Sequence, residues 1–153
     1  YDKADELRLR ANIEEFALAT QQAGKQWLLL DLTNAFPLWM AAQEYRDAYF
    51  ESPEDLAGYQ AGELTEFVAD LTARLKAKIS EESGPDTVVA LLGVGTLFGL
   101  ARVSSVVEGI KEGVSGRLLV FFPGEHHPEG HTYRLLDARD GWNYLAVPLL
   151  AQK

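Results

Sequence analysis

The stretch Thr87-Val88-Val89-Ala90-Leu91-Leu92 is an uninterrupted, mostly apolar run that ends at the glycine-containing turn Gly93-Val94-Gly95. Two similar runs, residues 27–32 and 117–122, lie before and after it in the chain. Short continuous apolar runs are typical of strands that are covered on both faces, as the central strands of a parallel sheet are. The three runs therefore predict a mostly parallel central sheet.

Segments with the apolar spacing of helices separate these strands. Apolar side chains recur three and four positions apart in residues 9–20, 38–50, 64–79 and 103–114, and Gly24 supplies a C-terminal stop for the first of these helices. Strands that alternate with helices of this length are typical of an α/β fold. We therefore expect helices on both faces of the sheet.

The C-terminal part of the chain has a different pattern. Pro123-Gly124-Glu125 is expected to end the third strand and to lead into a histidine-rich loop. Residues 132–136 and 142–147 are strand-like runs joined across the turn residues Asp140-Gly141. They predict a β-hairpin that adds antiparallel strands to the sheet.

Length and composition limit the class of protein. The chain has 153 residues, which is the size of one domain, and we expect a single α/β domain over residues 1–153. It has 14 Lys and Arg against 23 Asp and Glu, a net charge of −9, which opposes non-specific binding to nucleic acid. The absence of cysteine excludes disulfides, thiolate zinc sites and a cysteine nucleophile.

Two expectations concern location and the start of the chain. No stretch has the roughly 18 uncharged apolar residues of a membrane span, and we expect a cytoplasmic protein. The chain opens at Tyr1, without Met and directly before a helix. We therefore expect a segment upstream of Tyr1 that includes a strand.

Gly93, Gly95 and Gly99 follow a strand and precede a helix, which is where nucleotide-binding loops lie. A dinucleotide fingerprint would have its third glycine at position 98, where Phe98 stands, and the chain contains no Gly-Lys-Ser/Thr sequence. We interpret these glycines as a tight turn with close helix–strand packing. A degenerate nucleotide-binding domain that senses ATP stays the alternative.

The three histidines, His126, His127 and His131, lie beside Glu125 and Glu129. Imidazole and carboxylate groups together can bind a divalent transition metal. The spacing matches no established metal motif, so a solvated loop is the preferred interpretation and a metal site the alternative.

Several polar residues are expected at strand ends or turns, where they could coordinate magnesium or act as acid and base. They are Asp31, Asp137, Arg139, Asp140 and Asn143. Turn chemistry at Asp140 and an ion-pair cluster around Arg139 are the preferred interpretation, and a catalytic role is the alternative. The chain also lacks a Gly-x-Ser-x-Gly nucleophile elbow. We predict no enzymatic activity and no cofactor.

The segment 38–50 is rich in aromatic residues. Trp39, Tyr45, Tyr49 and Phe50 exceed what one buried helix face needs, and surplus aromatics at a surface favour a protein interface. Taken singly, each is better explained as core, because Trp39 and Phe50 share the apolar stripe. A local nucleic-acid patch would need the arginines Arg102, Arg117, Arg134 and Arg139.

Two C-terminal stretches, residues 117–125 and 133–148, resemble the signature of the BrxB family. Residues 27–33, 39–46 and 88–102 resemble further parts of the same family, so the resemblance covers nearly the whole chain. BrxB is a component of BREX, the bacteriophage-exclusion defence systems of bacteria and archaea. Motif positions that the resemblance marks as important are Pro123, Gly124, Glu125, Arg134, Asp137, Arg139, Asp140, Trp142 and Tyr144.

The resemblance implies a non-enzymatic adaptor in a phage-defence complex. BrxB accompanies a phosphatase-like protein, PglZ, together with an adenine methyltransferase and a large ATPase, and the family has no established catalytic activity. A direct contact with the PglZ-like protein is therefore expected. The predicted interface is either the aromatic segment around Trp39, Tyr45, Tyr49 and Phe50 or the C-terminal hairpin with Arg139, Trp142 and Tyr144.

Overall fold

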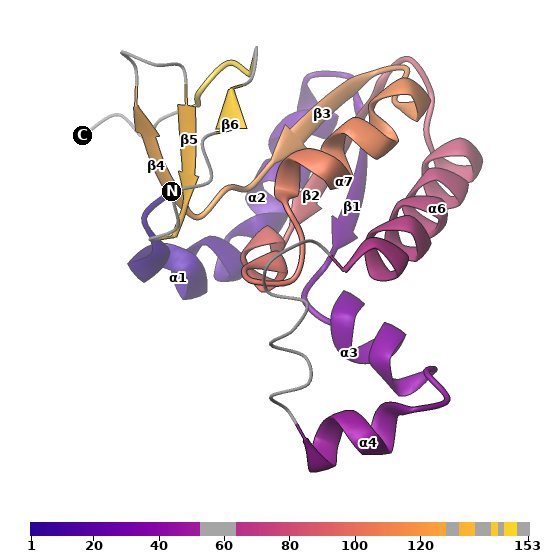
Figure 1. Cartoon of the computed structure of the whole chain (residues 1–153). Coiled ribbons are helices and arrows are strands. Elements are labelled where there is room, and N and C mark those ends of the chain that lie inside the picture. The colour runs from indigo at the N-terminus through magenta and orange to yellow at the C-terminus, as the bar shows by residue number, and fades with distance from the viewer. Residues whose placement is uncertain (53–63, 128–131, 137–141, 144–145, 150–153) are drawn as a thin grey trace.

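The computed structural model describes residues 1–52, 64–127, 132–136, 142–143 and 146–149. These residues form an α/β fold in which helices cover both faces of a parallel sheet, with a smaller antiparallel sheet after it (Figure 1). The fold class predicted from the three apolar runs is confirmed.

The central sheet has the order β1-β2-β3 with all strands parallel. Its strands are β1 (Gln26–Asp31), β2 (Thr87–Leu92) and β3 (Arg117–Val120). Val89 of β2 pairs with Leu28 of β1 on one side and Leu118 of β3 on the other. Strand β2 is thus enclosed, and Val89, Ala90 and Leu91 have no exposed surface.

One face of the sheet is covered by the helices that connect the strands. Helix α6 (Thr65–Glu82) buries Phe67, Leu71, Leu75 and Ile79, which recur every fourth residue on one face. Helix α7 (Val103–Ile110), followed by the short 3-10 helix η3 (Lys111–Gly113), buries an equivalent stripe. Both predicted apolar stripes are confirmed. Among the described residues, no helix has the length and apolar character to cross a bilayer.

The opposite face is covered by the N-terminal segment, which consists of η1 (Lys3–Asp5), α1 (Glu6–Ala11) and α2 (Ile13–Gln22). The expectation of one helix over residues 9–20 is wrong, because α1 ends at Ala11 and Asn12 separates it from α2. The amide Nδ2 of Asn12 donates to the Arg8 carbonyl at 2.7 Å, which competes with the helical pattern. A second, smaller core of Ala90, Leu92 and Phe121 lies beneath these helices.

The aromatic segment forms two short helices, α3 (Ala35–Ala41) and α4 (Arg46–Glu51), so the expectation of one helix over residues 38–50 is also wrong. Side chains satisfy the carbonyls at the end of α3: Gln43 donates to Trp39 at 3.1 Å, and Arg46 donates to Ala41 at 3.0 Å. Helix α3 buries Ala35 and Met40, whereas α4 buries no residue and lies away from the sheet (Figure 1).

The C-terminal strands β4 (Gly124–His127), β5 (Thr132–Leu135) and β6 (Trp142–Asn143) form a separate antiparallel sheet in the order β4-β5-β6. The predicted pairing of β5 with β6 is confirmed. Two expectations are wrong: the hairpin does not join the central sheet in the described chain, and Gly124–His127 is a strand instead of a loop. Its polar sequence lacks apolar alternation, and main-chain pairing with β5 makes it a strand.

Gly124, the first residue of β4, lies close to the main chain of β5. A Cβ atom on Gly124 would lie 1.9 Å from the Arg134 carbonyl oxygen, so no other residue fits without a backbone shift. Gly124→Ala is expected to lower the free energy of unfolding by about 1–3 kcal/mol. Gly84→Ala is the control, because a Cβ there meets nothing within 4 Å. Urea unfolding measures both, and a Gly124→Ala variant as stable as the parent contradicts this account.

Candidate functional site

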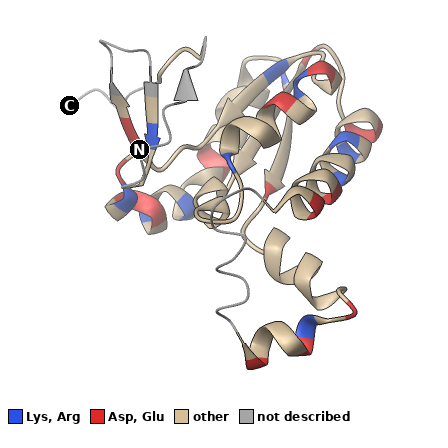
Figure 2. Ribbon diagram, viewed as in Figure 1, with Lys and Arg blue, Asp and Glu red and all other residues tan. Residues whose placement is uncertain are grey.

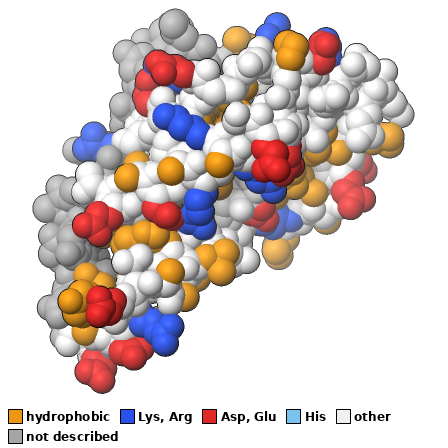
Figure 3. All heavy atoms as spheres, turned by 90° about the vertical axis from the view of Figure 1, so that its right-hand side faces the viewer, with side chains coloured by type: hydrophobic (Ala, Val, Ile, Leu, Met, Phe, Trp, Pro, Cys, Tyr) orange, Lys and Arg blue, Asp and Glu red, His pale blue; other side chains and the backbone are white. Residues whose placement is uncertain are grey.

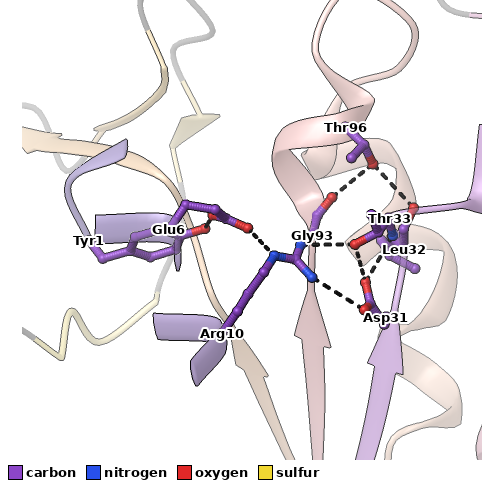
Figure 4. A network of polar contacts seen from close by, with 8 residues as sticks. All are labelled: Tyr1, Glu6, Arg10, Asp31, Leu32, Thr33, Gly93 and Thr96. Carbon is purple, nitrogen blue, oxygen red and sulfur yellow. Dashed lines mark hydrogen bonds and ion pairs between the residues drawn. The ribbon is translucent and has the colours of Figure 1, made fainter. Parts of the chain in front are cut away.

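The carboxyl ends of β1 and β2 meet at one edge of the sheet, which is where open α/β sheets bind ligands. Asp31 is the last residue of β1, and Gly93 follows the last residue of β2. Arg10 reaches this edge from α1, which lies on the face of the sheet opposite α6 and α7 (Figure 4). We call the side chains of Tyr1, Glu6, Arg10, Asp31 and Thr33 the carboxyl-edge network.

Arg10 is the centre of this network. Its Nε lies 2.6 Å from the Glu6 carboxylate, its Nη1 lies 3.4 Å from Asp31, and its Nη2 donates to the Thr33 hydroxyl at 2.8 Å. The Thr33 amide donates to Asp31 at 2.9 Å, and the Thr33 hydroxyl donates to the same carboxylate. The Tyr1 hydroxyl donates to Glu6. These bonds tie α1 to the end of β1.

The charges of the network shift the pKa values of its members. Burial alone would raise the pKa of Asp31, but the hydrogen bonds from Thr33 and the charge of Arg10 outweigh it and lower the pKa. Burial opposes the charge of Arg10, yet Glu6 and Asp31 raise its pKa overall. Burial and the hydrogen bond to Glu6 raise the pKa of Tyr1. Asp31 and Arg10 are therefore held as an ion pair.

The glycine loop closes against this network. Gly93 has φ +76°, and a Cβ there would lie 2.7 Å from the Thr33 hydroxyl and 2.9 Å from the Asp31 carboxylate. The Thr96 hydroxyl lies 2.8 Å from the Gly93 carbonyl and 3.2 Å from the Leu32 carbonyl, which joins the loop to the end of β1 (Figure 4). The geometry at Gly93 matches the interpretation of a tight turn with close packing.

Two amides of the glycine loop donate to carbonyls of the same loop. Residues 94–97 form the 3-10 helix η2 (Val94–Leu97), and the amides of Thr96 and Phe98 donate to the Gly93 and Gly95 carbonyls. Leu100 and Ala101 donate to Leu97. A phosphate-binding loop presents such amides to its ligand. Nucleotide binding by Gly93, Gly95 and Gly99 stays an untested alternative, and this arrangement gives it no support.

His126 and His127 lie in β4, so the expectation of a loop is wrong for these two residues. The His126 ring lies 4.8 Å from the Tyr133 ring, and Glu125 lies opposite Arg134 in the register of β4 and β5. Among the described residues, no three His, Cys, Asp or Glu side chains lie together as metal ligands.

The other polar candidates are not brought together. Asp31 belongs to the central sheet and Asn143 to β6 of the second sheet. Arg102 precedes α7 at the carboxyl end of the strands, whereas Arg117 begins β3 at the amino end. Along α6, acidic residues lie toward both ends and the basic residues lie between them (Figure 2). Predicted residues that lie outside the described part are Glu129, His131, Asp137, Arg139, Asp140 and Tyr144.

The aromatic candidates divide into core and surface. The Trp39 ring lies 5.5 Å from the Phe67 ring and packs against the larger core. Tyr49 is half-buried, whereas Tyr45 and Phe50 are 71% and 73% exposed. The interpretation that Tyr45 and Phe50 belong to the core is therefore wrong. Together with Leu38, which is 63% exposed, they form what we call the exposed α3–α4 surface. At the lower end of the molecule in Figure 3, hydrophobic side chains lie among acidic and basic ones.

Sequence reasoning missed most of the carboxyl-edge network. Glu6 and Arg10 lie in α1, and Tyr1 precedes it, in a segment where the sequence pattern indicates an apolar stripe and no polar site. The pattern also gives no sign that Leu38 is exposed. The spacing of Glu6 and Arg10 is the i,i+4 spacing of helical ion pairs, which is a local signal. The contacts of Arg10 with β1 span more than 20 residues, and no local pattern indicates them.

The fold and its closed carboxyl edge define a small α/β domain with an exposed apolar surface on α3 and α4. A family model described as "BREX protein BrxB" matches residues 29–149, and the chain belongs to this family. No curated protein matches the chain, and no solved structure does. The resemblance found in the C-terminal stretches is thereby confirmed.

Asp31→Asn tests the carboxyl-edge network. It keeps the size of the side chain and removes its charge, and we expect the free energy of unfolding to fall by about 0.5–1 kcal/mol at neutral pH, since Asp31 is partly exposed and solvent screens the pair. The pKa of Asp31 is lowered by folding, so its stabilisation is complete above the unfolded value of about 3.9 and disappears as the pH falls through the folded value.

Urea unfolding over a pH series measures this difference, which should shrink below about pH 4. Glu14→Gln, which removes an exposed carboxylate on α2, is the control for loss of one negative charge. A difference that stays constant from neutral to acid pH contradicts the assigned role of Asp31.

Mg-ATP titration followed by thermal unfolding tests the nucleotide alternative. A ligand at 100 times its dissociation constant adds about 2.7 kcal/mol to the stability of the folded state. Because the amides of Thr96 and Phe98 donate within the loop and Gly93 packs against Thr33, we expect no change in melting temperature. A saturable rise that Gly95→Ala abolishes would establish the alternative instead.

Proposed function

We propose that this BREX component is a non-enzymatic adaptor that holds other proteins of the defence system together. Its direct partner in this proposal is the PglZ-like protein, which resembles a phosphatase. Family membership supports a role inside BREX. The observation that carries the adaptor role is the exposed α3–α4 surface. A cytoplasmic location is part of the same proposal.

The exposed α3–α4 surface has the character of a docking site. Helix α3 contains no charged residue, and Leu38, Tyr45 and Phe50 each expose more than three-fifths of their surface. Exposed aromatic side chains are typical of protein interfaces, whose most important residues are enriched in Trp, Tyr and Arg.

Helix α4 adds a second reason to expect a partner. It has six residues and buries none of them. Isolated helices shorter than about 12–15 residues are marginally stable in water. The free-energy cost of forming the first turn exceeds what the few hydrogen bonds of a short helix regain. A partner that covers Tyr45 and Phe50 would supply the burial that α4 lacks within the described chain.

The carboxyl-edge network supports a structural role for the polar residues of the sheet. Arg10, Asp31 and Thr33 are bonded to one another and to Glu6, so their donors and acceptors are used internally. The close approach at Gly93 leaves no room for a side chain between the ends of β1 and β2. The net charge of −9 also favours protein partners over bare DNA.

Co-elution with the PglZ-like protein in size-exclusion chromatography with light scattering tests the proposal. The parent chain is expected to form a stable complex at micromolar concentration. The double variant Tyr45→Ser, Phe50→Ser should weaken the complex by more than about tenfold, since an interface aromatic contributes about 2 kcal/mol or more. Its circular dichroism should be unchanged, because both side chains are exposed.

Leu18→Ser is the matched control, since Leu18 is a 55% exposed apolar residue on α2, across the sheet. A double variant that binds as the parent does places the interface elsewhere, with the C-terminal hairpin as the next candidate. Separate elution of the parent chain and the PglZ-like protein overturns the direct contact itself.

A further inference from the structure

The negative charge of the chain is concentrated in the segment that contains α3 and α4. Between Lys25 and Arg74 the sequence has nine acidic residues and one basic residue, Arg46. The rest of the chain has fourteen acidic and thirteen basic residues and is nearly neutral. Almost all of the net charge of −9 therefore belongs to the segment that carries the exposed α3–α4 surface.

Arg46, the basic residue of this segment, is held by contacts within the chain. Its Nη1 donates to the Ala41 carbonyl at 3.0 Å, and its Nε lies 3.4 Å from the Asp47 carboxylate. Glu44 and Glu51 differ, because both are exposed and no described residue forms a hydrogen bond or an ion pair with either carboxylate. Within the described chain, the charge of Arg46 is thus used, whereas the charges of Glu44 and Glu51 are uncompensated.

These two carboxylates lie next to the exposed aromatic side chains in the sequence. Glu44 directly precedes Tyr45, and Glu51 directly follows Phe50. Acidic and hydrophobic side chains also lie together at the lower end of the molecule in Figure 3. The exposed α3–α4 surface therefore combines apolar groups with carboxylates beside them.

Helix α4 has the placement of an element that enters a groove. It lies away from the sheet, and none of its residues is buried (Figure 1). In helix-in-groove recognition, a helix lays its apolar side chains into a hydrophobic groove of another protein. Like charges that face each other across an interface oppose binding strongly. A groove that accepts α4 must therefore carry basic residues where Glu44 and Glu51 come to lie.

We propose that the exposed α3–α4 surface binds a groove on its partner that is hydrophobic at its base and lined with lysine and arginine at its rim. Tyr45 and Phe50 enter this groove, and the carboxylates of Glu44 and Glu51 face the basic rim. The inference rests on the proposed adaptor role, with the PglZ-like protein as the partner. It adds that attraction between opposite charges brings the two proteins together and sets their orientation.

Association kinetics at several salt concentrations test the charge complementarity. The chain is mixed with the PglZ-like protein at about 50, 150 and 500 mM NaCl, because added salt screens exposed charges over progressively shorter distances. Biolayer interferometry measures the association and dissociation rate constants. The association rate constant is expected to fall at least about tenfold over this range, whereas the dissociation rate constant should change less than about threefold.

The double variant Glu44→Lys, Glu51→Lys tests the two carboxylates directly. It is expected to slow association at least about tenfold at low salt, because each lysine would then face the basic rim. Glu44→Gln, Glu51→Gln, which removes the charges without reversing them, should slow association less. The matched control is Glu81→Lys, Glu82→Lys, which makes the same change in net charge in the last turn of α6. The control should associate within about twofold of the parent rate.

Two results would overturn the basic groove and leave the adaptor role standing. One is a complex whose association rate constant is the same at every salt concentration, and the other is a Glu44→Lys, Glu51→Lys variant that binds as the parent does. An equal loss of association rate in the control variant also contradicts the groove, because the net charge of the chain would then act without regard to position. Absence of any complex overturns both proposals, since the PglZ-like protein then offers no groove to α4.

Discussion

The enclosure of β2 is the constraint on which the rest of the structure depends. Its amides and carbonyls are bonded to β1 and β3 on its two edges, and its side chains contact helices on both faces. A buried strand leaves no main-chain group for water, so both neighbours must be present and in register. The connections must then cross the faces of the sheet, which places α6 and α7 on one side and α1 and α2 on the other.

The carboxyl edge of this sheet shows how the fold uses its polar residues. In many α/β proteins this edge binds a ligand, whereas here Arg10 crosses it and pairs with Asp31, and Gly93 packs directly against Thr33. The polar groups hold the N-terminal helices onto the sheet. Among the described residues, Leu38, Tyr45 and Phe50 of the exposed α3–α4 surface carry the apolar groups that we propose for partner binding, in a chain that belongs to the BrxB family.

Prediction from the sequence succeeded where periodicity was long or continuous. The three apolar runs became β1, β2 and β3, and the stripes of α6 and α7 are buried as expected. It failed where side chains end a helix early, as Asn12 does between α1 and α2 and Gln43 and Arg46 do after α3. Apolar spacing continues through such breaks, so the stripe alone predicts one helix where two form.

By itself the sequence determined the α/β class, the position of the three parallel strands and the family, because each depends on local patterns of residue type. Only the tertiary structure decided that Gly124–His127 pairs as a strand, that Phe50 is exposed while Trp39 packs in the core, and that Arg10 meets Asp31. These outcomes depend on which distant segments lie side by side. A contact between residues far apart in the chain leaves no periodic signal at either end.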